Sequence, residues 1–316
     1  MGGGPPVSEN SGRGSVDQYA TLPSGTTICF RDYGDEADPA ILLIAGLGED
    51  LTFWGSFVHS LVVRGFRVVA MDNRDVGRST FTATPAPRLW RQMLGRPRRD
   101  GYSLADMAED GVGVLDHLGI ARVHLVGRSM GGMIAQTIAA TEPRRALSLT
   151  SLFSTTGAGR VGQPALSTLR LLAAPPARTR TEAVCAHLRI TAHVAGEAYP
   201  IDDAAEAAIA ARGWDRSAGD PAAGNARQIQ AIQASGDRTA QLSRITAPTL
   251  VINGDRDLLV APSGGAATVR AIRSARHVVF PGMGHHIPEA LVDPITQHIS
   301  QHADRVGNGG NDVENS

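Results

Sequence analysis

Short apolar runs alternate with longer amphipathic segments through most of the chain. Apolar runs of four to six residues, mostly β-branched or Leu, are typical of strands buried on both faces of a sheet. They predict strands at 41–45, 67–71, 123–126, 147–152, 249–252 and 277–280, with an antiparallel strand ahead of them at 26–33. The amphipathic segments predict helices at 56–64, 104–118, 131–141, 262–272 and 288–302. This alternation predicts an α/β fold with a mostly parallel central sheet and helices on both faces.

The alternation is interrupted between residues 154 and 243. This segment is rich in Ala and Arg and carries short helical patterns separated by Pro and Gly, without a buried-strand pattern. Because structureless loops of this length are rare in compact domains, we expect an all-helical insertion. The predicted organisation is a core of residues 19–153 and 244–305, an insertion at 154–243, and disordered tails at 1–18 and 306–316, which lack an apolar period.

Composition and charge exclude several classes of function. The 316 residues include 30 Lys and Arg against 31 Asp and Glu, a balance that gives no sign of a nucleic-acid or anionic-membrane partner. No apolar stretch is long enough to span a membrane, and the first residues lack the pattern of a secretory signal. Cys29 and Cys185 are too few for a disulfide framework and lack metal-ligand spacing. With no dinucleotide-binding sequence either, we expect a cytoplasmic protein that uses no cofactor and no metal.

One short motif carries specific chemistry. The sequence Gly127-Arg128-Ser129-Met130-Gly131 lies between a predicted buried strand and a predicted helix, which is the context that a G-x-S-x-G nucleophile requires. The turn must be sharp enough to expose the hydroxyl group, and Gly127 and Gly131 remove Cβ atoms that would clash across it. It also places Ser129 at a helix N-terminus, where free N–H groups favour developing negative charge. Ser129 is therefore the predicted nucleophile.

A serine nucleophile needs a base, and the base needs an acid that orients it. Asp255 and Asp257 follow one of the last two predicted strands, and His285 and His286 follow the other. Since the carboxyl ends of parallel strands meet at one edge of a sheet, these side chains are expected near Ser129. The chain order Ser, Asp, His also agrees with this arrangement. Position alone does not choose between the two aspartates or between the two histidines.

Attack of a serine on a carbonyl group also requires an oxyanion hole, in which two backbone N–H groups stabilise the developing negative charge. Met130 supplies one, because it follows the nucleophile directly. The other is expected from the Gly-rich loop after the strand at 41–45, where Leu47 lies between Gly46 and Gly48. The two glycines give the backbone freedom to turn the Leu47 N–H group inward. Leu47 and Met130 are thus the predicted oxyanion hole.

At these residues the chain resembles the α/β-hydrolase superfamily, over about residues 23–305. The run at 72–79, D-N-R-D-V-G-R-S, is similar to the D-x-R-G-x-G-x-S segment of that family. Asp75 stands where glycine is commoner, and a similar version occurs in aclacinomycin methylesterase-like carboxylesterases. Those enzymes also share the G-M-G-H sequence found here at 282–285. The resemblance is therefore closest to this group of esterases.

The resemblance implies an α/β-hydrolase fold in which the helical insertion is a cap that determines the substrate. It also implies Asp257 as the acid, three residues after the glycine that ends its strand, and His285 as the base, directly after G-M-G. Two positions depart from the pattern. Ala45 replaces a histidine that often braces the oxyanion loop, and Arg128 is bulkier than many members carry. Arg128 is expected to form a salt bridge with the insertion rather than to meet an acidic group of the substrate.

Together these features predict a serine hydrolase that cleaves a small-molecule carboxylic ester through an acyl-enzyme intermediate. The same three residues would also serve a lactonase, a thioesterase or a C–C bond hydrolase. Epoxide hydrolases and haloalkane dehalogenases need a carboxylate where Ser129 stands, so those activities are disfavoured. A protein of another class, a hydrolase-fold ligand receptor with little turnover, is the remaining alternative because a fold does not determine a function.

Overall fold

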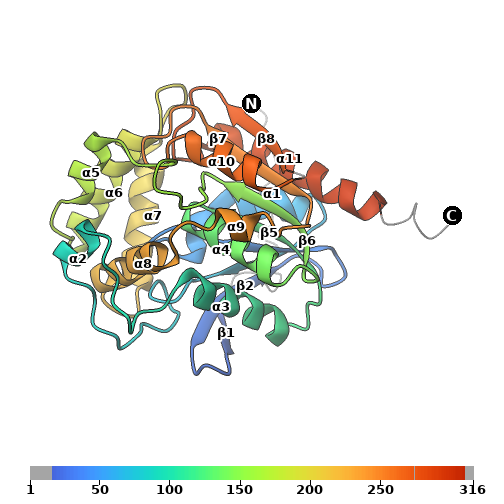
Figure 1. Ribbon diagram of the computed structural model, residues 1–316, viewed down its shortest axis with the longest axis horizontal. Coiled ribbons are helices and arrows are strands. Elements are labelled where there is room, and N and C mark those ends of the chain that lie inside the picture. Colours follow the sequence, from blue (N-terminus) through green and yellow to red (C-terminus); the bar gives the residue numbers. More distant parts are fainter. Residues whose placement is uncertain (1–15, 274, 310–316) are drawn as a thin grey trace, which may run out of the picture.

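An eight-stranded sheet in the order β1-β2-β4-β3-β5-β6-β7-β8 forms the centre of the molecule (Figure 1). The computed structural model describes residues 16–273 and 275–309. β3 to β8 are parallel, whereas β2 is antiparallel to both β1 and β4. The strands are β1 Gln18–Thr21, β2 Thr27–Tyr33, β3 Ala40–Ile44, β4 Arg67–Met71, β5 Val123–Arg128, β6 Ala146–Leu152, β7 Thr249–Gly254 and β8 Ala275–Phe280. The predicted mostly parallel sheet is confirmed; β1 was not predicted.

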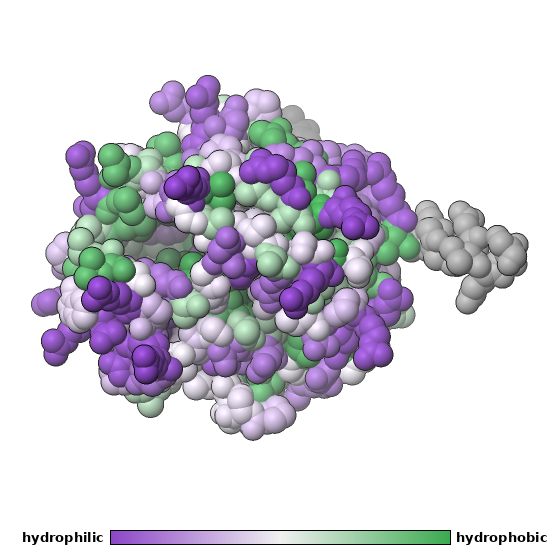
Figure 2. Space-filling model, viewed as in Figure 1, coloured by the Kyte–Doolittle hydropathy of each residue, from purple (hydrophilic) through white to green (hydrophobic). Residues whose placement is uncertain are grey.

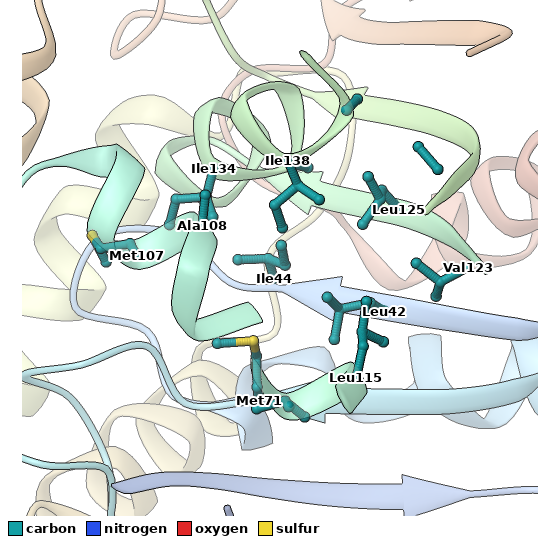
Figure 3. Close-up of a cluster of buried hydrophobic side chains, with 14 of the residues drawn as sticks. Leu42, Ile44, Met71, Met107, Ala108, Leu115, Val123, Leu125, Ile134 and Ile138 are labelled. Atoms are coloured by element: carbon teal, nitrogen blue, oxygen red, sulfur yellow. The ribbon is translucent and has the colours of Figure 1, made fainter. Parts of the chain in front are cut away.

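Side chains of the central strands are buried on both faces, as their continuous apolar runs predict. Along β3, Leu42 and Ile44 belong to the cluster under α3 and α4, where they meet residues such as Ile138 (Figure 3). The alternate residues Ile41 and Leu43 belong to a second cluster on the opposite face. Successive side chains of a strand point to opposite faces, so one strand contributes to both clusters. The sheet is therefore the middle layer of three.

Five helices cover the two faces of the sheet. The cluster on one face includes residues of α3 and α4, and the cluster on the other includes residues of α1 and α11. The start of α3 is fixed by a capping box in which Ser103 and Asp106 satisfy each other's backbone N–H groups. The covering helices are α1 Gly55–Val63, α3 Leu104–His117, α4 Met130–Thr141, α10 Ser263–Ala271 and α11 Glu289–Gly309. Helices on both faces were predicted, and this is confirmed.

The segment between β6 and β7 is helical, and no strand occurs among its residues, all of which the structure describes. Acceptor side chains directly before three of its helices explain where these begin: Thr179, Asp202 and Asp220 accept hydrogen bonds from the first turns of α6, α7 and α8. Its helices are α5 Leu166–Leu172, α6 Arg180–Val194, α7 Asp203–Arg216, α8 Pro221–Ser235 and α9 Thr239–Leu242. The division of the chain into core and cap at 154 and 243 stays a prediction.

The first strand and the last helix each include residues of the predicted tails at 1–18 and 306–316. β1 begins at Gln18 and α11 continues to Gly309. Asp17 accepts a hydrogen bond from Arg31 at 2.6 Å, an interaction that an apolar period does not reveal. Residues 1–15 and 310–316 of the predicted tails lie outside the described residues. Among the residues described, no helix is long and apolar enough to cross a membrane.

Candidate active site

Ser129 lies on a strained turn between β5 and α4. Its backbone has φ 55° and ψ −117°, a conformation that residues other than glycine rarely adopt. The two glycines of the motif allow this turn: a Cβ at Gly127 would lie 2.1 Å from the carbonyl oxygen of Gly131, and a Cβ at Gly131 would lie 2.0 Å from that of Ile44. A hydrogen bond of 2.8 Å from the Ser129 N–H to the Leu152 carbonyl fixes the turn against β6.

Ser129, His285 and Asp257 form one chain of hydrogen bonds. His285 Nε2 lies 3.0 Å from Ser129 Oγ, and His285 Nδ1 lies 2.6 Å from Asp257 Oδ2. The second carboxylate oxygen of Asp257 accepts the N–H groups of Leu259 and Val260, each at 2.8 Å. Asp257 and His285 are each 3% exposed, so water competes little for these contacts. The structure therefore brings together the three residues that the sequence and its resemblance singled out.

The loop that carries His285 is held by the end of α6. The N–H groups of Gly284 and His285 donate to the carbonyls of Ala195 and Val194, at 2.7 and 2.6 Å. The ring of Phe153 packs against the imidazole with ring centroids 5.5 Å apart. The helical segment between β6 and β7 thus contacts the backbone of the histidine itself.

The two competing residues make other contacts. Asp255 Oδ1 accepts the N–H of Gly282 at 2.6 Å, and its side chain is 43% exposed. His286 Nε2 lies 3.7 Å from Glu206 Oε1, and the residue lines a cavity of about 320 Å³ on the α7 side. Asp255 closes the loop before the histidines, and His286 packs against α7. Neither takes part in the hydrogen-bond chain from Ser129.

Burial lowers the pKa of His286, because desolvation disfavours the imidazolium form. Burial also opposes ionisation of Glu206, yet its pKa is lowered overall, since His187 hydrogen-bonds to its carboxylate at 2.7 Å and His286 lies beside it. Glu206 therefore remains a carboxylate between two imidazoles. This group ties α6, α7 and the His285 loop to one another.

The loop after β3 carries Leu47, one of the two predicted oxyanion donors, between two N–H groups that side chains bind. The Gly46 N–H donates to Glu49 Oε2 at 2.8 Å, and the Gly48 N–H donates to Gln228 Oε1 at 2.9 Å. For the N–H of Leu47, which lies between them, no partner is found in the described part of the chain. Met130 is the first residue of α4, where a helix leaves its N–H groups without internal partners. Both predicted donors are thus at positions that leave an N–H group available.

Arg128, directly before Ser129, connects three parts of the site. Its guanidinium forms an ion pair with Glu49 of the oxyanion loop and donates to the carbonyl of His285 at 2.7 Å. It also lies over the ring of Phe53, 4.5 Å from the centroid. The predicted ion pair of Arg128 with the insertion is therefore wrong: the partner is Glu49, 79 residues earlier in the chain. The sequence analysis does not identify Glu49, because no local pattern around it indicates an ion pair with a residue 79 positions away.

Ala45 stands where a bracing histidine was expected, and another side chain takes part in holding this loop. Asn73 Nδ2 donates to the Ala45 carbonyl at 3.0 Å from the end of β4. Together with the Glu49 carboxylate on the Gly46 N–H, this contact fixes the start of the loop. A histidine is therefore not needed to brace it.

No group of three or more His, Cys, Asp or Glu side chains that could hold a metal ion is found among the described residues. Cys29 is buried, and its burial raises the pKa of the thiol to about 12. A thiol with this pKa stays protonated and is a poor nucleophile or metal ligand at neutral pH.

Comparison with known proteins identifies the family of the fold. Residues 39–289 match the family model described as the alpha/beta hydrolase fold. The chain belongs to this family. The α/β-hydrolase fold expected from the resemblance is thus confirmed, and hydrolase activity is the activity that the family supports.

Among similar proteins, rhodomycin D methylesterase of Streptomyces peucetius is 28% identical over 87% of this chain and 94% of its own length. A solved hydrolase of Pseudomonas aeruginosa is 26% identical with a TM-score of 0.67, covering 92% of this chain and 98% of that one. The enol-lactonase of Burkholderia xenovorans is 27% identical with a TM-score of 0.68, covering 90% and 99%. The resemblance to methylesterase-like carboxylesterases is confirmed by the first of these.

Proposed function

We propose that this α/β hydrolase is a serine carboxylesterase of the methylesterase type, which cleaves a small-molecule ester. The observation that carries the proposal is the continuous hydrogen-bond chain from Ser129 Oγ through His285 to Asp257, with distances of 3.0 and 2.6 Å. The strained turn that presents Ser129 adds support, because such strain persists where function requires it. The methylesterase relative supports the choice of an ester with a small alcohol group.

In the proposed mechanism, His285 Nε2 takes the proton from Ser129 as Oγ attacks the ester carbonyl. The backbone N–H groups of Leu47 and Met130 stabilise the oxyanion of the tetrahedral intermediate. His285 then protonates the departing alcohol, which leaves an acyl group on Ser129. Water, activated by the same imidazole, releases the acid and restores the hydroxyl group. Asp257 keeps the Nδ1–H tautomer in place and stabilises the imidazolium.

We further propose that residues 154–243 act as a cap that determines the substrate. Two contacts support this role: the end of α6 binds the backbone of Gly284 and His285, and Gln228 of α8 binds the N–H of Gly48 in the oxyanion loop. A segment that contacts both loops of the site can also enclose whatever lies between them. The predicted cytoplasmic location stays a prediction.

Labelling with a fluorophosphonate probe and turnover of short p-nitrophenyl esters test the proposal together. The Ser129→Ala variant should lose labelling, and its kcat should fall by about 10³–10⁶. Asp257→Asn should lower kcat by about 10⁴, because the amide favours the wrong imidazole tautomer. A Ser129→Ala enzyme with near-normal turnover would refute the assignment.

Neighbouring residues supply matched controls. Asp255→Asn changes the same group two positions away from Asp257, and His286→Ala removes the imidazole next to His285. Since neither residue is in the hydrogen-bond chain, both variants should retain labelling and keep kcat within about threefold of the wild type. If Asp255→Asn lost activity while Asp257→Asn retained it, Asp255 would be the acid. If His286→Ala lost activity while the corresponding His285 variant retained it, His286 would be the base.

The same acyl-enzyme chemistry would open a lactone, and similarity to an enol-lactonase makes this the alternative to test. A series of lactones assayed beside the p-nitrophenyl and methyl esters separates the two. Higher kcat/KM on lactones would change the substrate class without changing the residues. Absence of labelling in folded wild-type protein would instead favour a ligand-binding receptor.

A further inference from the structure

Two short helices carry an unusual number of exposed apolar side chains. α2, Leu89–Met93, buries none of its residues, and α5, Leu166–Leu172, buries only Thr168. Large apolar side chains on these helices and the residue after α2 are 45% to 76% exposed: Leu89, Trp90, Met93, Leu94, Leu166, Leu169 and Leu172. Figure 2 shows hydrophobic atoms over α2 and α5, on either side of a hollow at the left of the view. A clustered apolar surface of this kind marks an interaction site.

Basic residues surround the apolar side chains of α2. Between residues 85 and 100 the sequence has five arginines, at 88, 91, 96, 98 and 99. Its single acidic residue in this range is Asp100, which pairs with Arg98 at 2.6 Å. The exposed members of this set include Arg88, Arg96 and Arg99, and α5 adds exposed Arg170. The net charge of −1 for the whole chain conceals this local excess of positive charge.

α5 contacts a loop of the candidate active site directly, and α2 is connected to another through α8. At the start of α5, the Ala165 N–H and Thr168 Oγ1 donate to the carbonyl of Leu258, the residue after Asp257, at 2.9 and 2.8 Å. On the other side, Gln233 of α8 donates to the carbonyl of Gln92 in α2 at 2.7 Å. The same helix α8 binds the oxyanion loop. The apolar surface therefore flanks the site from two sides.

We propose that α2 and α5 form a docking surface for a lipid bilayer with anionic headgroups. Leu, Trp and Met beside arginines are the combination that binds a membrane interface, with the apolar side chains among the acyl chains and the guanidinium groups at the phosphates. A second copy of the chain fits less well, because two such surfaces would bring their arginines together. Docking would place the site against a lipid phase from which an apolar ester can enter. Only that last step rests on the proposed esterase function.

Flotation with phospholipid vesicles tests the docking surface directly. Wild type and Ser129→Ala should both bind vesicles of phosphatidylglycerol and phosphatidylcholine, and both should bind pure phosphatidylcholine at least about tenfold more weakly. Trp90 is 46% exposed, so its fluorescence emission should shift to shorter wavelength on binding, and a Trp90→Phe variant should lack this shift. Because Ser129→Ala is included, binding is measured whether or not the esterase proposal holds.

Two double variants, Leu89→Ser with Met93→Ser and Leu169→Ser with Leu172→Ser, should each weaken vesicle binding by about tenfold or more. Val63→Ser on α1 is the matched control, since Val63 is 69% exposed but lies outside this surface, and it should bind as the wild type does. The α2 double variant and Val63→Ser, which change residues outside the proposed cap, should hydrolyse a water-soluble p-nitrophenyl ester at the wild-type rate. Equal binding by all variants, or no binding by the wild type, would overturn the proposal. The proposal would also be overturned if the wild type formed a dimer and bound no vesicles, and if the double variants were monomeric. The surface would then serve self-association.

Discussion

The helical segment between β6 and β7 contacts the rest of the chain in two different ways. Its second half is fastened by buried ion pairs. Arg227 of α8 donates through two nitrogens to the carboxylate of Asp75, at 2.7 and 2.8 Å, and the Asp75 side chain has no exposed surface. Arg216, at the end of α7, lies within 3.2 Å of Asp17, Asp50 and Asp72.

In the first half, α5 has no comparable anchor among the residues that the structure describes. α5 buries a single residue, Thr168, and holds its place through the carbonyl of Leu258 and the ring of His193, 3.0 Å from the threonine hydroxyl. Besides the contact of His187 with Glu206, α6 is joined to α7 by the ion pair of Arg180 with Asp215, whose side chains are both more than half exposed. Exposed ion pairs of this kind contribute about 0–1 kcal/mol.

This difference separates two tasks within one insertion. The α7–α8 half contacts the oxyanion loop through Gln228, so its position must be fixed if the backbone donors are to stay preorganised. α5 borders the hollow and the exposed apolar surface (Figure 2). Regions that move for function are drawn from the least stable parts of a fold. A fixed half and a loose half follow from these contacts.

Removing the most buried anchor should have the largest effect on stability. Arg227→Met leaves the Asp75 carboxylate buried without its cationic partner, although Thr82 still donates to it, and should lower the free energy of unfolding by about 3–5 kcal/mol. Equilibrium urea unfolding measures this change. Arg170→Met makes the same substitution on α5, where the side chain is exposed, and should change it by less than about 0.5 kcal/mol. Equal midpoints for the two variants would contradict the division into a fixed and a loose half.

The next prediction compares two glutamines of one helix. Gln228 accepts the Gly48 N–H at 2.9 Å and donates to the Arg74 carbonyl at 2.8 Å, whereas Gln233 donates to Gln92 of α2. Gln228→Leu should lower kcat about tenfold with little change in KM, because the oxyanion loop loses a fixed contact that matters most in the transition state. Gln233→Leu should keep kcat within about twofold. Steady-state kinetics on a soluble ester, with circular dichroism as the check on folding, decides between them.

Much of the site could be predicted because its chemistry is local in sequence. The turn at Ser129 requires glycine at 127 and 131, and that requirement is visible in five residues. The choice of Asp257 over Asp255 needed the family resemblance, since both lie in one short loop. In the structure the Asp255 carboxylate accepts a hydrogen bond from the N–H of Gly282, and the spacing of residues in the sequence does not reveal this contact.

The contacts that fasten the insertion could not be predicted for a related reason. Arg227 and Asp75 are 152 residues apart, and an arginine in an Ala-rich helix looks like any solvated surface residue. In the sequence Asp75 is only a departure from the family's usual glycine. Its positive φ of 67° is the conformation that glycine would supply, and its carboxylate adds the partner of Arg227. Helix α2 escaped prediction because its five residues bury nothing and show no period.

The smallest effect is expected on the loose half itself. Leu166 is 76% exposed at the start of α5, so Leu166→Ser should leave the free energy of unfolding within about 0.5 kcal/mol of the wild type.

Native-state hydrogen exchange on the wild type should show the amides of α5 opening at a lower free energy than those of α8, because α8 is held by Arg227, Gln228 and Gln230. If the α5 amides were protected as strongly as those of α8, the two halves would open as one unit. The exposed leucines would then belong to a rigid surface, and access to Ser129 would have to come from a movement elsewhere.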